Sequence, residues 1–165
     1  MEKIVIHWFR RDLRLEDNHA LYRALTSGLK VIPIFIFDKN ILKVLDKKDR
    51  RVSYIHFVLD NLNQQLFEKY HSGIEFYFDT PKMAFEKIIQ KYNVYAVFTN
   101  KDYEPYAVER DKEIQKMLDK NNILFYLLKD HVLFEEKEII KENGEPFLVY
   151  THYANAWKKK FFDEI

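Results

Sequence analysis

The stretch IVIHWFRRDLRLEDNHAL, residues 4–21, joins an apolar run to the start of an amphipathic segment. In many nucleotide-binding α/β proteins the turn after the first strand is built from glycines, which let the backbone approach phosphate. This turn has no glycine and instead carries arginines and aspartates: Arg10, Arg11, Arg14, Asp12 and Asp17. The stretch therefore predicts a buried strand and a turn held in part by pairing between charged side chains.

Further apolar runs alternate with longer amphipathic segments along the chain. The runs are nearly continuous, which is typical of parallel strands buried on both faces: residues 4–8, 31–37, 74–78, 94–99 and 123–128. Helices are predicted between them, over residues 19–26, 51–70, 82–92 and 104–121. In the last of these helices we expect ERDKE, residues 109–113, to form the face exposed to solvent.

The repeated strand–helix unit predicts one α/β domain over residues 1–130. The expected fold is a Rossmann-like, five-stranded, doubly wound parallel sheet in the order 3-2-1-4-5, with helices on both faces. Pro33 conflicts with the second strand, because proline is disfavoured in central strands, but its neighbours are strongly apolar.

Residues 131–165 do not continue this alternation of strands and helices. Short extended pieces are expected around a turn at Asn143 and Gly144, followed by a helix with Thr151 as its cap. Tyr153, Trp157 and Phe161 recur at helical spacing, and we expect them to be partly exposed because such a stripe covers an apolar partner.

The sequence lacks the motifs of several common classes of catalytic and binding sites. The chain has 165 residues, a net charge of +1, only three glycines and no cysteine. Phosphate-binding glycine motifs, thiolate metal sites and a Gly-x-Ser-x-Gly nucleophile are therefore excluded, and the histidines lack metal-ligand spacing. No run is long enough to span a bilayer, and we expect a cytoplasmic protein.

The predicted topology itself indicates where a ligand would bind. In open parallel sheets that place lies beyond the carboxyl ends of the strands, where the strand order reverses. Here the loops after the first and fourth strands would meet, with residues 38–50 folded over them. The expected pocket contains charges and aromatic rings, which suit a flat heterocycle with an anionic tail: Arg11, Arg51, Asp102, Glu104, Trp8, Phe9 and Tyr103. A structural cluster of ion pairs is the alternative.

Five blocks resemble the DNA photolyase and cryptochrome family, in the family's order. They are HWFRRDLRLEDNHAL, FDKNIL, RRVSYIHFVLDNLNQQL, NKDYEPYAVERDKEI and VYTHYANAW. The resemblance covers essentially the whole chain and identifies it with the family's N-terminal α/β domain, which holds a light-harvesting antenna pigment. It also implies that residues 131–165 lead into a linker to a helical FAD-binding domain, absent from this sequence, through which DNA would be bound.

The resemblance implies a chromophore site made of particular residues. Positions contacted by a deazaflavin antenna in some members, or lying in the same blocks, match six residues here: Arg11, Asp38, Leu42, Arg51, Asp102 and Glu104. Folate-type members carry an Asn-Glu pair where this chain has Tyr106 and Ala107, so a deazaflavin or FMN is favoured over methenyltetrahydrofolate.

The expected function is therefore that of an antenna domain of a deoxyribodipyrimidine photo-lyase. The parent protein would use blue light and FAD to repair cyclobutane pyrimidine dimers, while this chain alone would not be catalytic. We expect a monomer without membrane association. Two alternatives remain at this point: a light-signalling module of the cryptochrome type, and a stand-alone nucleotide-binding domain of similar fold.

Overall fold

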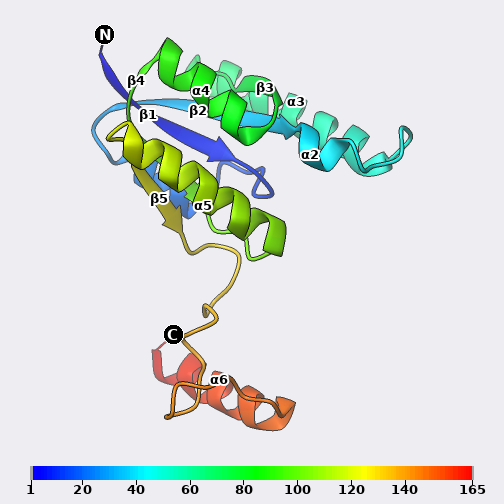
Figure 1. The fold of residues 1–165 in the computed structure, drawn as a ribbon, viewed down its shortest axis with the longest axis vertical. Helices are drawn as coiled ribbons and strands as arrows, with labels where there is room; N and C mark the ends of the chain where they lie inside the picture. The colour runs from blue at the N-terminus through cyan, green and yellow to red at the C-terminus, as the bar shows by residue number, and fades with distance from the viewer. Residues whose placement is uncertain (1, 165) are drawn as a thin grey trace. The chain divides into compact units, whose positions relative to one another are not determined.

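The structure, a computed structural model, describes residues 2–164 (Figure 1). Strands and helices alternate along most of the chain, as the apolar runs predicted. In chain order the elements are β1 (Lys3–Phe9), α1 (His19–Leu25), β2 (Lys30–Asp38), α2 (Lys39–Leu42), α3 (Arg50–Tyr70), β3 (Glu75–Asp79), α4 (Pro81–Lys91), β4 (Asn93–Asn100), α5 (Pro105–Lys120), β5 (Leu124–Leu128) and α6 (Tyr150–Glu164).

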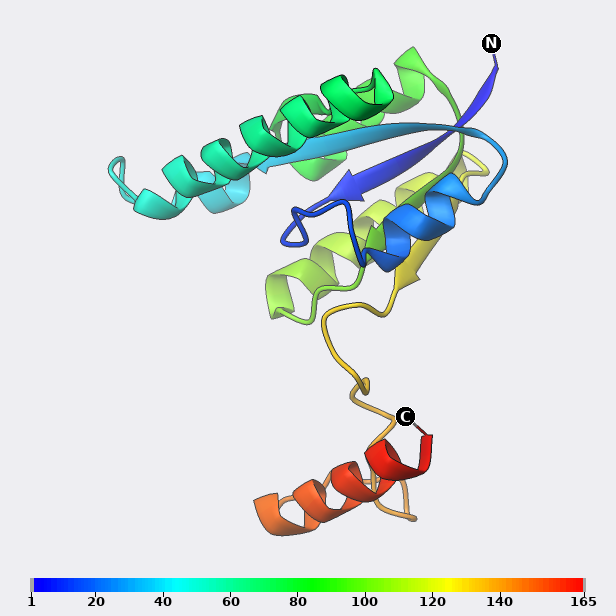
Figure 2. The same ribbon diagram turned by 180° about the vertical axis from the view of Figure 1, so that it is seen from behind.

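The five strands form one parallel sheet in the order β3-β2-β1-β4-β5, which confirms the predicted fold class and topology. Figures 1 and 2 show helices on both faces of this sheet. Side chains of α4 and α5 share one apolar cluster with the strands, whereas those of α3 and α1 share two clusters on the opposite face. The strand order reverses between β1 and β4. The chain proceeds from β1 through β2 to β3 at one edge of the sheet, and then from β4 to β5 at the other edge.

β1 lies at the centre of the sheet and is buried along nearly its whole length. Ile4, Ile6 and Trp8 pack in the cluster with α4 and α5, while Val5 and Phe9 pack in the clusters on the opposite face. This alternation follows from the twofold repeat of a strand, and the absence of an exposed face explains the continuous apolar run.

Pro33 is accommodated because of where it lies in β2. It is opposite His7 of β1, but the pairing of β2 with β3 begins only at the next residue, Ile34, which is opposite Glu75. Proline is tolerated where one side of a strand has no partner. The strand β2 is therefore continuous through the proline.

Local details differ from the sequence-based expectations at several positions. The short helix α2 within residues 38–50 was not predicted, and α6 begins at Tyr150, so Thr151 lies inside the helix and is not its cap. The prediction that ERDKE is a solvated face was wrong at its centre, because the side chains of Arg110 and Asp111 are only 9% and 6% exposed. No strand lies between residues 131 and 149.

Residues 131–164 form a compact unit of their own, separate from residues 2–130. In it Trp157 stacks on Phe161, with ring centroids 5.2 Å apart, and meets Phe134 edge-on at 5.5 Å. Ile139 is the buried residue of this unit. Trp157 and Phe161 are half-buried and Tyr153 is 38% exposed, as expected for the stripe. Within residues 2–164, no helix is long and apolar enough to cross a membrane.

Candidate functional site

A cavity of about 920 Å³ lies at the carboxyl ends of β1 and β2, beside the point where the strand order reverses. Its walls come from the turn after β1, the segment after β2, the first turns of α3, and the loop between β4 and α5. The volume is typical of sites that bind cofactors and other small molecules. All six residues singled out in the sequence line it: Arg11, Asp38, Leu42, Arg51, Asp102 and Glu104.

Most of the cavity wall is apolar. The end of β1 contributes Trp8 and Phe9, and the end of β2 contributes Phe35, Ile36 and Phe37. The segment after β2 adds three aliphatic side chains: Ile41, Leu42 and Leu45. The sequence analysis placed Tyr103 here as well, but it is not among the lining residues. Such walls exclude water from a bound planar ring and supply a large area for hydrophobic contact.

Arg11 faces two carboxylates across the cavity mouth. Its Nη1 lies 3.3 Å from Oδ1 of Asp102 and 3.7 Å from Oε1 of Glu104, and its side chain is 59% exposed. The structure therefore brings these three predicted site residues together as an ion-pair cluster. The charge of Arg11 is therefore balanced by carboxylates of the β4–α5 loop.

Arg51 is held by the start of its own helix. Asp49 caps α3 by accepting from the backbone N–H of Arg51, and its carboxylate lies 2.6 Å from Nη2 of the same residue. These hydrogen bonds lower the pKa of Asp49 to about 2. The side chain of Arg51 is 74% exposed at the mouth of the cavity. Its guanidinium group is therefore accessible to an anionic ligand but is already paired with Asp49.

Asp38 and Tyr106 connect opposite walls of the cavity. The Tyr106 hydroxyl donates to Oδ2 of Asp38 at 2.5 Å and accepts from the side-chain amide of Asn40. Oδ1 of Asp38 accepts from the backbone N–H of Asn40 and so caps α2. Partial burial and the Asp38 carboxylate raise the pKa of Tyr106, which therefore remains a donor.

Two arginines that the sequence analysis did not assign to the site, Arg10 and Arg110, also line the cavity. Arg10 forms a bidentate pair with Asp111, with Nη1 at 2.6 and 2.8 Å from the two carboxylate oxygens, and also donates to the carbonyl of Asn100. Arg110 lies 3.0 Å from the same carboxylate. The guanidinium carbons of Arg10 and Arg110 lie 5.0 and 4.9 Å from the ring of Trp8, so both make cation–π contacts with this wall of the cavity.

The first turn is further fixed by a buried polar network. The amide of Asn100 donates to Oδ2 of Asp12 at 2.6 Å and to Oδ1 of Asn18 at 2.9 Å, and Asn18 caps α1. Asp17 adopts a left-handed backbone with φ of 50°, and its carbonyl accepts from Arg14. The turn therefore needs no glycine, because Asp17 can adopt the left-handed conformation and side chains from other segments hold the remaining residues of the turn.

His7 is fully buried behind the turn, and neither ring nitrogen has a hydrogen-bond partner among the described residues. Burial lowers the pKa of His7 to about 4, although Asp12 and Asp130 oppose this shift. Its ring meets Phe9 edge-on, with centroids 4.3 Å apart. His7 is therefore a neutral core residue and contributes no charge to the site.

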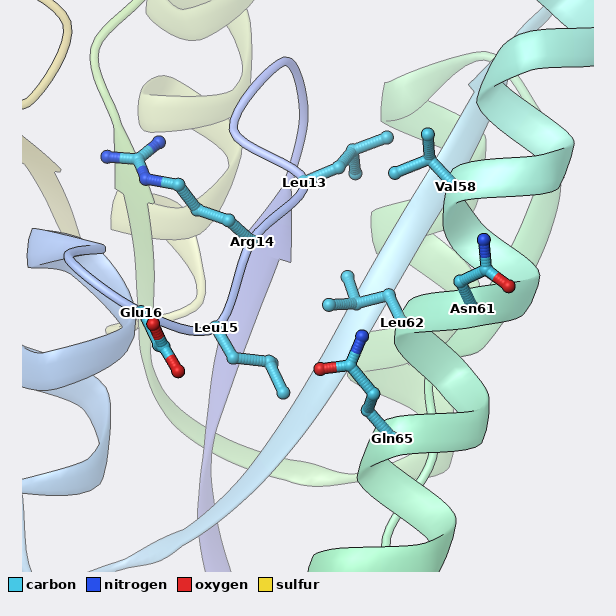
Figure 3. Close-up of a pocket in the computed structure, with 8 residues that line it drawn as sticks. All are labelled: Leu13, Arg14, Leu15, Glu16, Val58, Asn61, Leu62 and Gln65. Carbon is cyan, nitrogen blue, oxygen red and sulfur yellow. The ribbon is translucent and has the colours of Figure 1, made fainter.

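A smaller pocket of about 350 Å³ continues the cavity along α3 (Figure 3). The two share Leu13, Arg14 and Val58. In Figure 3 the side chains of Leu13 and Val58 point toward one another, whereas Arg14 points away from α3, toward its partner Asp130 at 2.7 Å. Among residues 2–164, no group of histidines and carboxylates is arranged to hold a metal ion.

Comparison with known proteins agrees with this architecture. The family model described as DNA photolyase matches residues 5–165. The chain belongs to the DNA photolyase family. The deoxyribodipyrimidine photo-lyase of Synechococcus sp. is 30% identical over 154 residues, which are 93% of this chain and 32% of the relative. Cryptochrome-1 of Drosophila melanogaster is 30% identical over 155 residues, covering 90% of this chain and 29% of the relative.

Solved structures of photolyases share the fold. A bacterial class III photolyase from Agrobacterium tumefaciens matches with a TM-score of 0.83 and 26% identity, over 96% of this chain and 32% of that one. An archaeal photolyase from Sulfolobus tokodaii matches with a TM-score of 0.75 and 30% identity, over 92% of this chain and 33% of that one. That structure holds two FAD molecules and implicates a novel light-harvesting cofactor. The chain thus corresponds to the N-terminal α/β domain of photolyases and spans about a third of these relatives.

Proposed function

We propose that this chain is the light-harvesting domain of a photolyase and that the cavity beside β1 holds its antenna chromophore. The observation that carries the proposal is the cavity itself, an apolar site of about 920 Å³ that collects all six residues expected from the family resemblance. The domain spans residues 1–130, and residues 131–165 lead toward an FAD-binding domain of the same parent protein. Repair of pyrimidine dimers and contact with DNA belong to that longer protein.

The residues of the cavity fit a flavin-type ring. When bound, the chromophore would absorb blue light and pass the excitation on. The protein's own contribution is to enclose the ring between apolar walls and to orient its polar edge. Burial of the ring's apolar area would supply most of the affinity, at about 25 cal/mol per Å² before the costs of ordering the ligand.

A deazaflavin or FMN fits the site better than methenyltetrahydrofolate. Tyr106 stands where folate-type relatives carry asparagine, and its hydroxyl is already used by Asp38 and Asn40. Ala107 stands at the position of their glutamate and is buried without a polar side-chain atom. The pair that would hold a pterin is therefore replaced by one side chain that is occupied and one that cannot form a hydrogen bond.

Arg11 and Arg51 would orient the ligand by exchanging partners. Each is exposed at the mouth and paired with carboxylates of the protein. Replacing one charged partner by another gives little net energy, so the arginines discriminate between ligands more than they add affinity.

The test is a fluorescence titration of the purified chain with FMN, a deazaflavin and methenyltetrahydrofolate. We expect the flavin-type ligands to bind and the folate to bind at least about tenfold more weakly, a difference of about 1.4 kcal/mol. Arg51→Ala should reduce the preference for flavin-type ligands over the folate, whereas Arg23→Ala, at an exposed position on α1 outside the cavity, should leave the preference unchanged. Tight folate binding that Arg51→Ala leaves unchanged, without flavin binding, would refute the assignment.

A further inference from the structure

The strand β3 forms one edge of the sheet, and its outer side is unpaired. Its neighbour is β2, and no other segment within residues 2–164 extends the sheet beyond it. An edge strand can pair with another chain, and proteins block such pairing with a proline, a bulge or a charge in the strand. The sequence of β3, EFYFD, has no proline, pairs with β2 without a register shift, and carries charges only at its two ends. The outer edge of β3 is therefore available to a further strand.

The face of β3 that is turned toward α3 is aromatic and largely uncovered. Phe76 and Phe78 lie opposite Phe35 and Phe37 of β2, which pack in the apolar cluster with α3. Phe76 and Phe78 are nevertheless 45% and 65% exposed. The helix α3 therefore leaves the edge strand uncovered on this face.

The second half of α3 adds two exposed rings on the side next to β3. The side-chain carbonyl of Asn63 accepts from the backbone N–H of Ile74, just before β3, and so marks this side of the helix. Phe67 and Tyr70 follow Asn63 at spacings of four and seven, which place them on the same side. They are 69% and 64% exposed.

These four aromatic residues form the edge patch: Phe67, Tyr70, Phe76 and Phe78. An aromatic side chain contributes about 150–250 Å² of surface, so at the exposures given above the patch presents on the order of 500 Å². Two such patches together reach about 1,000 Å², the size at which specific protein interfaces begin. Exposed apolar patches of this size mark interaction sites.

The edge strand is complementary to itself in an antiparallel pair centred on Tyr77. In this register Tyr77 lies opposite Tyr77 of a second copy, and Phe76 lies opposite Phe78 of that copy on the α3 face. Directly opposite aromatic side chains stabilise an antiparallel pair. A second copy of β3 therefore matches both the backbone edge and the aromatic side chains.

Charge on the other face of β3 is balanced in the same register. Glu75 would lie opposite Asp79 of the second copy, and two bare carboxylates at such positions would repel one another. Each carboxylate, however, has a lysine of α4 in its own chain. Nζ of Lys91 lies 2.9 Å from Glu75, and Nζ of Lys87 lies 2.7 Å from Asp79. The facing carboxylates are therefore accompanied by an equal number of cations.

We propose that this chain forms a twofold-symmetric dimer in which β3 pairs antiparallel with β3 of a second copy. The two sheets become one continuous sheet, and the same patch of each copy contributes to the interface, as twofold symmetry requires. This proposal departs from the monomer expected from the sequence. It does not depend on the proposed antenna function.

Sedimentation equilibrium of the purified chain tests the association. We expect wild type to have twice the mass of one chain at about 100 μM, a concentration that detects affinities in the micromolar range. Phe78→Lys places a charge opposite Phe76 of the second copy and should raise the dissociation constant at least about tenfold. Tyr22→Lys is the matched control, because Tyr22 is 64% exposed on α1, which packs against β1 and β4.

Circular dichroism and melting temperatures establish that both lysine variants fold as the wild type does. A wild-type mass of one chain at this concentration would overturn the proposal. So would a dimer that Phe78→Lys leaves intact, or one that Tyr22→Lys dissociates equally well.

Single cysteines test the register, because the chain has no cysteine of its own. Directly opposite residues of an antiparallel pair have Cα atoms about 4.5–5.5 Å apart, a separation that a disulfide can span. Tyr77→Cys should therefore cross-link to itself when an oxidant is added. Val44→Cys, at a position that is 75% exposed outside the edge patch, should cross-link at least about tenfold more slowly. Equal rates for the two variants would contradict the antiparallel pair centred on Tyr77 and overturn the proposal.

Discussion

The hydroxyl of Tyr106 and the carboxylate of Asp38, 68 residues apart in the chain, are joined by a hydrogen bond of 2.5 Å across the candidate chromophore cavity. This bond connects the first turn of α5 to the end of β2. Asp38 is 7% exposed, so its carboxylate depends on protein donors in place of water. The contact therefore fixes the distance between two walls of the cavity.

Removing this hydroxyl tests the connection. We expect Tyr106→Phe to lower the free energy of unfolding by about 1–2 kcal/mol, because a buried carboxylate loses a donor while the ring is retained. Urea denaturation of the domain measures the change. Tyr22→Phe is the control, since Tyr22 is 64% exposed on α1 and should leave stability unaltered. Equal stabilities of the two variants would show that water replaces the Tyr106 donor.

Asp111 compensates two buried guanidinium groups, and its loss should be far more costly. Asp111→Asn would leave Arg10 and Arg110 without a counterion on side chains that are 6% and 9% exposed. We expect a loss of about 3–5 kcal/mol in the free energy of unfolding, the range found when one partner of a buried ion pair is removed.

The control for this variant is Asp119→Asn, on the same helix. Asp119 is exposed and accepts one hydrogen bond from Gln115, so the same isosteric change should cost less than about 1 kcal/mol. If Asp111→Asn cost no more than Asp119→Asn, the pairing beneath Trp8 would not stabilise the fold.

His7 should make stability depend on pH. Its pKa is about 4 in the folded chain against 6.5 for an ordinary histidine, so the unfolded chain binds a proton more readily. Stability contributed by neutral His7 is therefore full above pH 6.5 and decreases as the pH falls from 6.5 toward 4. The loss is at most about 3–4 kcal/mol, at about 1.36 kcal/mol per pKa unit.

The measurement is the free energy of unfolding as a function of pH for wild type and His7→Leu. We expect the difference between the two curves to change over this window and to be constant above it. His152→Leu, an exposed histidine of α6, should give a curve parallel to that of wild type. A constant difference for His7→Leu across the whole range would contradict the assignment of a neutral buried ring.

Trp157 should stabilise only the unit that contains it. Its ring contacts in the structure are Phe134 and Phe161, both within residues 131–164. We expect Trp157→Ala to abolish amide protection in residues 131–164 and to leave the melting temperature of the sheet domain unchanged, as measured by hydrogen exchange and calorimetry. A large decrease in that melting temperature would show that α6 stabilises the sheet.

The order of the sheet could be predicted because the physics behind it is local. Continuous apolar runs identify strands buried on both faces, and the right-handed crossover limits how they are connected. The same rules place a ligand site where the order reverses. Topology alone placed four of the predicted site residues in the expected pocket: Arg11, Arg51, Asp102 and Glu104. Asp38 and Leu42 were assigned only because their sequence block resembles a known family.

The pairing beneath the site could not be read from the sequence. Arg10 and Asp111 are 101 residues apart, and helical spacing alone gives Asp111 the pattern of a solvated position. Its burial follows from the packing of α5 over Trp8, which tertiary contacts determine. The short helix α2 was missed for a related reason, because four residues carry no periodicity.

The side-chain contacts of the turn after β1 also have a consequence for the order of events during biosynthesis. Its residues are fixed by Asn100, Asp111 and Asp130, at sequence separations of 88 to 116 residues. Contacts between such distant positions form late, because a long loop must close before they stabilise anything. A nascent chain emerging from the ribosome would therefore assemble its first turn last, and the cavity proposed to hold the antenna ligand would be complete only after translation has passed β5.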